Sequence, residues 1–345
     1  MMWLTWRQFR TQAIVAAAGL AAAAIVLLVS GVSLADKFHA SIAGCAAHGS
    51  CAQLAGNFLQ SLRGSSYQAV ALVITVLIYV APALIGVFWG APLITREIET
   101  GTLRLTWTQS VTRTRWLAVK VGSIGLVAMA SAGLLALMAS WWINPVYEAS
   151  MKANARADAL YRLSPPEFGV NGIAPIGYAA FGFALGLTLG VLIRRTLPAM
   201  AATLAVFAGI QVGWPQLIRP HLLTPLRSSM QITAANIDSL MMGGPSSHTM
   251  IVTAAFHKPG AWILSRQAVN AAGRPFTGPP TKACESGGIQ ACNASISRLH
   301  LRQIVTYQPG SRYWAFQWYE TAIFVAVALL LVWFCYWRVS RRRLT

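Results

Sequence analysis

Acidic residues are scarce in this sequence of 345 residues, which contains 9 Asp and Glu against 27 Lys and Arg. Charged residues make up only 10% of the chain and hydrophobic residues 56%. An ordinary soluble domain, by contrast, carries about a quarter charged residues. This composition excludes a typical soluble domain and indicates that a membrane solvates most of the chain.

A basic stripe with interleaved aromatic residues is also missing. The formal net charge of +18 is the kind of balance that nucleic-acid-binding proteins show. Here, however, the basic residues lie between long apolar stretches, so they form no continuous surface for a phosphate backbone. We therefore expect no nucleic acid among the partners.

Six segments are almost free of ionisable residues and long enough to cross a bilayer, which takes about 20 apolar residues. Their continuous apolarity favours helices over barrel strands, which alternate. The first has a longer apolar core than the roughly 7–15 residues of a signal peptide, so we interpret it as a retained helix. Only Glu320, at the outer end of the last segment, is charged; the six lie at 12–35, 68–94, 121–143, 172–193, 197–218 and 318–337.

The distribution of Lys and Arg predicts the orientation. With the N-terminus in the cytoplasm, 13 of the 27 basic residues fall on roughly 55 residues of cytoplasmic chain, and the other 14 spread over roughly 155 residues outside. An even number of spans returns the C-terminus to the same side. The protein is therefore expected to be multi-pass, with both termini cytoplasmic and all six histidines outside.

The cysteines fit this orientation. Cys45 and Cys51 lie close together in the first external loop, and Cys284 and Cys292 in the last. Each pair can form a disulfide in an oxidising compartment. A metal site is the alternative, since His39 and His48 lie near the first pair, but C-x2-C and H-x3-5-H spacings are missing. We predict two disulfides and no metal.

A long external insertion precedes the last span. Residues 219–316 contain many Pro and Gly breakers, and between them the runs "HTMIVTAAF" and "LHLRQIVTY" are rich in β-branched residues. These patterns predict a small extracytoplasmic, β-containing domain between the fifth and sixth helices of an otherwise all-α polytopic protein. The domain boundaries would be 1–218, 219–316 and 317–345.

Two devices for driving transport or catalysis are missing from the sequence. It has no G-x-x-x-x-G-K-[ST] phosphate loop, so it cannot bind ATP in that way. The spans carry no cluster of carboxylates, metal ligands or nucleophile and base. We therefore expect a non-catalytic protein without its own cofactor. Gly182, Gly186 and Gly190 form a small-residue ladder, which we interpret as helix packing within the subunit or across a dimer.

The stretch "TREIETGTLRLTWTQSVTRTRWLAVK", residues 95–120, joins the second and third spans and is rich in charge. Gly101 can end the preceding helix by adopting positive φ. Thr102 can then cap a short helix in which Leu103, Leu105 and Trp107 offer apolar anchors. The pattern indicates a docking surface for another protein.

The polar residues of this stretch leave a second interpretation open. Ordinary positive-inside residues with one interfacial Trp would also be basic and aromatic. Two acids, Glu97 and Glu99, a Gly-Thr break and an apolar tip beside Arg104 are more than topology requires. They favour the docking surface.

At these residues the sequence resembles a known family. "REIETGTLRLTWTQSVTRTRWLAVK" is similar to the acid-x-acid-x-Gly-Thr-Leu stretch, followed by Ser-x-x-Arg and a Lys, between the second and third spans of type 2 ABC exporter (ABC-2) permeases. "MWLTWRQFRTQ" near the N-terminus and "YQPGSRYWAFQWYE" at 307–320 resemble the actinobacterial branch. Val111 stands where many members have Pro, and the external insertion is unusually long.

The resemblance implies a partner arrangement. Two copies of the permease would join two ATPase subunits, which bind Mg-ATP, in the bacterial plasma membrane. The segment matching Glu97 to Trp107 would be the coupling helix that sits in a cleft of the ATPase. An N-terminal helix would lie along the inner membrane surface, which suits the amphipathic set Trp3, Trp6, Arg7, Phe9 and Arg10.

We therefore expect a homodimeric permease that exports an amphipathic compound, drug, peptide or lipid-like molecule when its partner hydrolyses ATP. Gln211, Trp214, Thr188 and Asn144 are candidates for the substrate path, with helix packing as the alternative. Glu320 marks either an exit or an interfacial charge.

Two other classes of function stay open from the sequence. A membrane-bound sensor or assembly protein would use the external domain to capture a ligand or partner. A polytopic membrane enzyme would use the histidines and acids of the external loop on lipid or cell-wall precursors. An ATPase partner would argue against the first, and loop-histidine substitutions without effect against the second.

Overall fold

The computed structural model describes residues 2–43, 45, 51–99, 113–153, 161–242, 250–276, 284 and 288–341. Within them, six helical spans are long and apolar enough to cross a membrane. Each coincides with one of the predicted segments, so the prediction that these six segments form long apolar helices is confirmed. They are built from α1 (Met2–Ile42), α4 (Ser66–Ile85), α7 (Arg113–Lys152), α9 (Ala174–Ile193), α10 (Thr196–Leu217) and α13 (Tyr313–Arg341).

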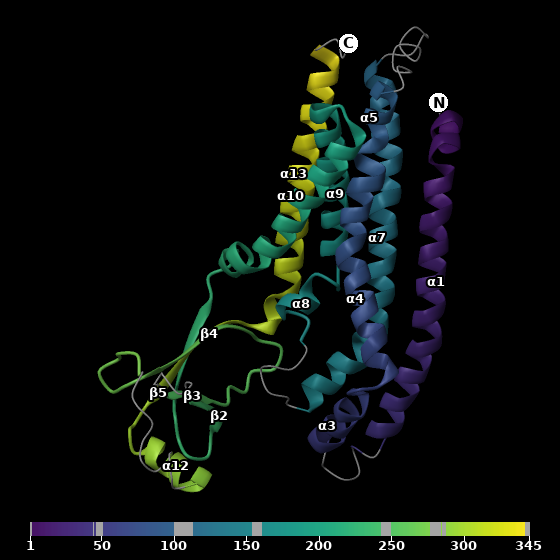
Figure 1. The fold of residues 1–345 in the computed structure, drawn as a ribbon. Helices are drawn as coiled ribbons and strands as arrows, with labels where there is room; N and C mark the ends of the chain where they lie inside the picture. Colours follow the sequence, from purple (N-terminus) through teal and green to yellow (C-terminus); the bar gives the residue numbers. More distant parts are fainter. Residues whose placement is uncertain are drawn as a thin grey trace.

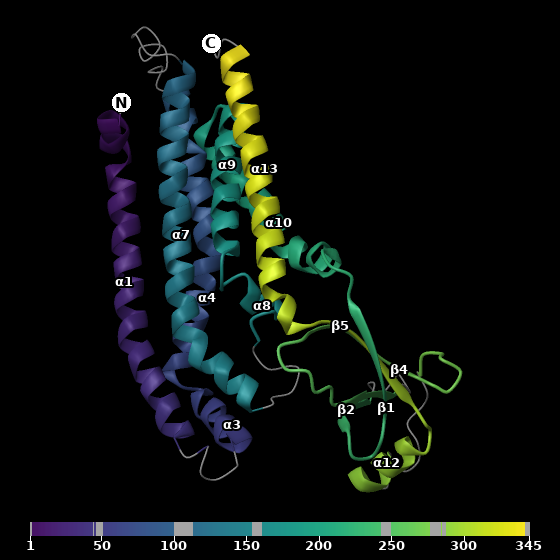
Figure 2. The same cartoon turned by 180° about the vertical axis from the view of Figure 1, so that it is seen from behind.

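Figure 1 shows the helices running side by side, with both chain termini at one end of the bundle and the strands at the other. We call these the terminal end and the strand end. In the view from behind in Figure 2, α1 forms one edge of the bundle and α10 and α13 the opposite edge. The most buried window belongs to α9, of which 72% is inside the protein, whereas only 11% of the α1 window is buried. The helices therefore pack around α9.

The second span changes helix type along its length. α4 continues through the π-helix η1 (Gly86–Gly90) into α5 (Pro92–Glu99). Pro82 lies inside α4, and Pro cannot donate an internal helix bond. The π-helical turn that follows is wider than an α-helical one, and such turns are frequent at functional sites.

The glycine ladder of α9 packs against this second span. A Cβ on Gly190 would lie only 2.6 Å from the carbonyl oxygen of Ala91. On Gly182 and Gly186 it would overlap the carbonyl oxygens of Pro82 and Gly86. The ladder therefore mediates packing within one chain, one of the two arrangements that the sequence left open.

The strands lie between α10 and α13 in the chain and form two small antiparallel sheets. The runs predicted as strands cover β3 and all but the last residue of β5, so these two strands are confirmed. The larger sheet has the order β1-β5-β4 and the smaller one pairs β2 with β3. Their bounds are β1 (Leu226–Gln231), β2 (Ile237–Met242), β3 (Met250–Ala254), β4 (Trp262–Val269) and β5 (Arg302–Gln308).

This β-containing region has its own hydrophobic core. Ile232, Met250, Ile296 and Leu301 are almost completely buried there. The short helix α12 (Gly288–Ser297) covers it and supplies Ile296 and Cys292. A separate core is what an independently folded insertion requires.

Both predicted cysteine pairs come together at disulfide distance. The Cα atoms of Cys45 and Cys51 are 4.7 Å apart at the start of α3 (Cys51–Leu62), and those of Cys284 and Cys292 are 4.3 Å apart at α12. Cys335 is buried in α13 as a free thiol. Within the described part of the chain no group of three His, Cys, Asp or Glu gathers around a possible metal position; His48 lies outside those residues.

The glycine contacts predict a matched pair of substitutions. Gly186→Ala should lower the free energy of unfolding by about 1–3 kcal/mol, because the new methyl group overlaps backbone that cannot move freely. Gly209→Ala, in α10, should be neutral, since nothing lies within 4 Å of a Cβ there. Thermal unfolding of both variants in detergent measures the difference. Equal midpoints for the two would contradict the close contact.

Candidate functional site

The segment expected to dock a partner is described only at its two flanks. Gly101, Thr102, Leu103, Arg104, Leu105 and Trp107 lie outside the described residues. The flanks are α5, which carries Glu97 and Glu99, and the start of α7. Both acids make contacts within the chain, and the contacts differ.

Glu97 joins α5 to α7. The Lys120 Nζ donates to Glu97 Oε1 at 2.5 Å, and only 7% of the Lys120 side chain and 14% of the Glu97 side chain are exposed. The ammonium also lies 5.0 Å from the centroid of the Trp116 ring, close enough for a cation–π contact. A shielded pair of this kind holds its geometry better than an ion pair in water.

Glu99 joins α5 to α10. Its carboxylate accepts the Thr196 backbone N–H at 2.8 Å and the Thr196 hydroxyl at 2.6 Å. Thr196 is the first residue of α10, where the unpaired N–H groups and the helix dipole favour an anion. These hydrogen bonds hold the pKa of Glu99 below its usual value. Both acids therefore tie the end of α5 to neighbouring spans.

An apolar core lies directly beneath these contacts. It contains residues from α1, the second span, α7, α9 and α13, so the second span shares one apolar core with four others. Phe9 of α1 meets Trp89 edge-on, with ring centroids 4.9 Å apart. Residues 2–10 form the first turns of α1. Arg10 is exposed there, whereas the side chains of Trp3, Trp6 and Arg7 lie outside those described.

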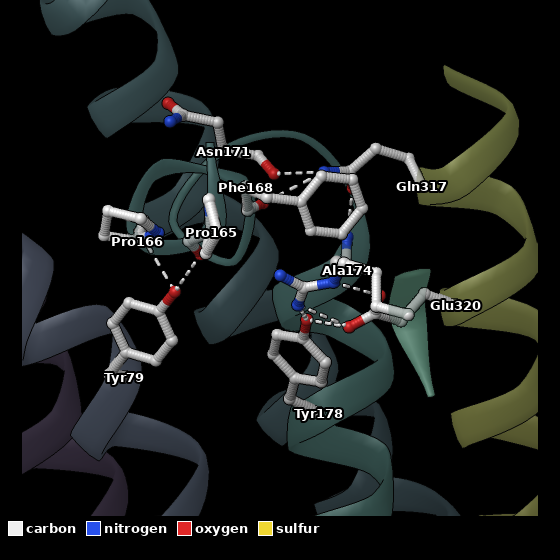
Figure 3. A network of polar contacts seen from close by, with 10 residues as sticks. Tyr79, Pro165, Pro166, Phe168, Asn171, Ala174, Tyr178, Gln317 and Glu320 are labelled. Carbon is white, nitrogen blue, oxygen red and sulfur yellow. Dashed lines mark hydrogen bonds and ion pairs between the residues drawn. The ribbon is translucent and has the colours of Figure 1, made fainter. Parts of the chain in front are cut away.

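A second polar cluster lies near the strand end and includes a buried ion pair. Arg219, in the 3-10 turn η2 (Arg219–His221), and Glu320 of α13 are 1% and 0% exposed. The guanidinium donates twice to the carboxylate, through Nε at 2.8 Å and Nη2 at 2.9 Å. The Tyr178 hydroxyl of α9 also donates to Glu320, and the two labelled side chains meet in Figure 3. The guanidinium lies 4.3 Å from the centroid of the Phe168 ring.

Gln317, one turn before Glu320, binds the chain that leads into α9. Its Nε2 donates to the carbonyl oxygens of Phe168 at 3.0 Å and Asn171 at 2.9 Å. Its Oε1 accepts the N–H groups of Ile173 at 2.9 Å and Ala174 at 2.8 Å. A single amide from α13 thereby satisfies both the short helix α8 (Pro165–Phe168) and the first N–H groups of α9, which no intrahelical acceptor serves. Figure 3 shows Gln317 reaching across to this turn.

The same stretch of chain also holds the connections to the β-containing region. Gln308 Nε2 donates to the carbonyl oxygen of Leu223 at 2.6 Å, and Arg312 donates to that of Thr224 at 2.7 Å. Arg312 also donates to Gln308 Oε1 at 2.8 Å. The segment 307–320 therefore ties the chain leaving α10 to the chain entering α13.

The remaining path candidates do not gather at one place. Gln211 and Trp214 are half-buried on α10, and the Trp214 ring packs 4.7 Å from Phe324. Thr188 is buried and donates to its own helix at Ala184. Asn144 is exposed near the strand end, where it accepts a hydrogen bond from Arg162 at 2.5 Å.

Sequence reasoning missed the partner of Glu320. We expected this acid at an exit or at the membrane interface, and the structure buries it against Arg219. Arg219 lies one residue beyond the predicted fifth segment, and Glu320 lies near the start of the sixth, so both occupy the outer ends of their spans. This shared depth was the signal from which the pairing of Arg219 with Glu320 could have been predicted, because charges inside the bilayer are rarely left unpaired.

These features define a multi-pass membrane protein whose described contacts tie the helices together at both ends of the bundle. The family model for ABC-2 membrane transporter related proteins matches residues 17–219, which is more than half of the chain. The chain therefore belongs to this family, the membrane-embedded components of ABC transporters. Searches of curated proteins and of solved structures returned no match.

The buried ion pair predicts a strong dependence on both partners. Glu320→Ala leaves the Arg219 charge without compensation and should lower the free energy of unfolding by about 3–5 kcal/mol. The apolar double substitution Arg219→Met with Glu320→Leu should lose much less, because no charge then stays buried. Thermal unfolding in detergent measures both.

The control for this prediction is Glu148→Ala. Glu148 forms an exposed pair with Lys152 at 2.9 Å one turn away, and such pairs contribute little. Stability of Glu320→Ala that matches Glu148→Ala would rule out a structural role for the buried pair.

Proposed function

We propose that this chain is the permease subunit of an ATP-driven exporter and works as a homodimer with two ATPase subunits. Its family membership supports the role of permease. The sequence lacks a phosphate loop, so energy would come from the Mg-ATP bound by the partners. The observation that carries the proposal is the attachment of α5, which precedes residues 100–112, to two different spans through Glu97 and Glu99.

The contacts of α5 support a coupling role for the segment that follows it. The Glu97–Lys120 pair links it to α7 and the Glu99–Thr196 contact to α10. A force applied to residues 100–112 would therefore be transmitted to the second span, α7 and α10 together. Leu103, Leu105 and Trp107 would supply apolar contact energy in a cleft of the ATPase, and Arg104 would guide the docking.

The proposed topology places the terminal end in the cytoplasm of a bacterial cell. The basic residues near Arg10, Arg195 and Arg338 support it. They lie near the start of α1, between α9 and α10 and near the end of α13, and Figure 1 shows these helix ends at the terminal end. The β-containing region would then be extracytoplasmic, where its disulfide is compatible with an oxidising environment. The domains would follow the boundaries 1–218, 219–316 and 317–345.

The proposed substrate is an amphipathic compound such as a drug, a peptide or a lipid-like molecule. A cavity of about 540 Å³ about midway along the bundle supports this class. Its walls come from α1, α4, η1 and α7 and are almost entirely apolar. Gln12, which donates to the Phe88 carbonyl oxygen at 2.9 Å, is one of its few polar side chains. Such a lining accepts hydrocarbon and gives little selectivity among polar groups.

The test is ATPase coupling in the reconstituted complex. Trp107→Ala should reduce affinity for the ATPase about 30-fold, because truncating an aromatic anchor often costs about 2 kcal/mol or more. Glu97→Arg should abolish substrate-stimulated hydrolysis, since it places a second cation beside Lys120. Co-purification measures the affinity for the ATPase, and ATPase assays measure the substrate-stimulated hydrolysis. Both use variants whose amount in the membrane equals that of the wild type.

Trp333→Ala is the matched control. Trp333 is 65% exposed on α13 and lies far along the chain from the docking segment, so its truncation should leave coupling unchanged. Undiminished substrate-stimulated hydrolysis in Trp107→Ala and Glu97→Arg would refute the coupling role.

A further inference from the structure

A cavity of about 480 Å³ lies at the strand end, where the spans meet the β-containing region. Its walls come from the end of α7, the chain before α8, the loop before β4 and the start of α13 (Figures 1 and 2). Two of the lining residues, Gly260 and Gly310, approach closely, since a Cβ on Gly310 would lie 2.8 Å from the Gly260 carbonyl oxygen. This contact joins the loop before β4 to α13, so the cavity is formed by the fold itself, as ligand sites usually are.

The cavity lies at the depth of the lipid headgroups. Asn144 directly follows the apolar segment 121–143, and Tyr313 and Trp314 precede the segment 318–337 by five and four residues. At 1.5 Å per residue, the α13 residues stand roughly 6–8 Å outside the hydrocarbon. The headgroup layer extends about 5–8 Å on each side. The Trp314 side chain is exposed beside the cavity, and Trp and Tyr prefer this layer.

Arg162 brings a positive charge to the cavity. Its Nη2 donates to Asn144 Oδ1 at 2.5 Å, and its guanidinium carbon lies 5.5 Å from the centroid of the Tyr147 ring. Both contacts are made with α7 and hold the guanidinium against that wall. Among the described residues Asn144 alone accepts a hydrogen bond from Arg162. Most of its five N–H groups therefore stay available for a phosphate.

Glu148 brings a negative charge one turn further along α7. It also lines the cavity and follows Asn144 by four residues, which is about 6 Å along the helix axis. Its partner Lys152, at 2.9 Å, is not a lining residue and lies 5.3 Å from the centroid of the Phe38 ring on α1. An exposed pair of this kind contributes little. A cationic group of a ligand can therefore take the place of Lys152.

The two charges select the class of ligand. A purely anionic group would be repelled by Glu148, and a purely cationic one by Arg162. A zwitterion whose two charges are a few ångström apart satisfies both side chains. Phosphoethanolamine has this chemistry, because two carbon atoms separate its phosphate oxygen from its ammonium. In the headgroup layer of a membrane, the molecule that carries this group is a phospholipid.

We propose that the cavity binds the headgroup of a zwitterionic phospholipid, phosphatidylethanolamine, from the leaflet at the strand end. The phosphate accepts hydrogen bonds from Arg162, the ammonium donates to Glu148, and the Trp314 ring packs beside the glycerol. The bound lipid bridges α7 and α13. One chain forms the whole site, so no interface between two copies is needed. The inference goes beyond the proposed function, because binding requires neither ATP nor an ATPase.

Native mass spectrometry of the full chain in detergent tests this site. The probes are phosphatidylethanolamine and the anionic phosphatidylglycerol with identical acyl chains. Phosphatidylethanolamine should bind the wild type at least fivefold more tightly. Arg162→Gln should weaken that binding at least fivefold, and Glu148→Gln should reduce the preference below twofold, because each removes one charge-assisted contact. Glu148→Arg should reverse the preference, since the cavity then holds two cations.

The matched controls are Arg63→Gln and Asp36→Asn. Both residues are exposed, lie next to the predicted segments 68–94 and 12–35, and do not line the cavity. Their variants should bind both lipids as the wild type does. Thermal unfolding in detergent checks that each variant is folded. Equal binding of the two lipids by the wild type would overturn the proposal, as would equal phosphatidylethanolamine binding by Arg162→Gln and Arg63→Gln.

A third measurement separates a lipid from a soluble zwitterion. Glycerophosphoethanolamine carries the same headgroup without acyl chains, so it should displace bound phosphatidylethanolamine only at more than tenfold excess. Displacement at equal concentration would show that the site takes a soluble compound and would overturn the lipid assignment. No outcome depends on transport. A failure of the proposed export would therefore leave this inference standing, and the reverse also holds.

Discussion

The close approach of α9 to the second span determines how the other helices are placed. Gly182, Gly186 and Gly190 bring the α9 backbone against the carbonyl oxygens of α4, η1 and the start of α5. Helices in a bilayer gain little from burying apolar surface, so backbone contact and dispersion must hold them. Only glycine allows this distance, and α9 consequently lies at the centre with α10 and α13 on one side and α4 and α7 on the other.

The two ends of the bundle satisfy their polar groups by exchanging side chains between spans. At the terminal end, Glu99 of α5 accepts the first N–H of α10. At the strand end, Gln317 of α13 accepts the first N–H groups of α9. A backbone donor left unpaired near hydrocarbon costs several kcal/mol, so each exchange both completes a helix and fixes its neighbour. The proposed function uses the first exchange to transmit a movement of α5 to α10.

The segment 307–320 gains a physical explanation from these contacts. Gln308 and Arg312 hold the chain that leaves α10, Gln317 holds the start of α9, and Glu320 pairs with Arg219. The β-containing region is attached to the bundle through both of its connections by this one stretch. Movements of α13 would therefore be transmitted to that region without a flexible joint.

The sequence by itself determined the elements that depend on solvent and local chain geometry. Apolar length located all six spans, β-branched runs located β3 and β5, and close spacing located both cysteine pairs. Only the tertiary structure decided which polar residues meet. Arg219 and Glu320 are 101 positions apart, as are Thr95 and Thr196, and Gln317 reaches residues more than 140 positions earlier. Periodicity reports which face of a helix meets hydrocarbon, and it carries no information about which distant helix lies beside that face. Those pairings follow from the packing of α9 against its neighbours, which no local pattern contains.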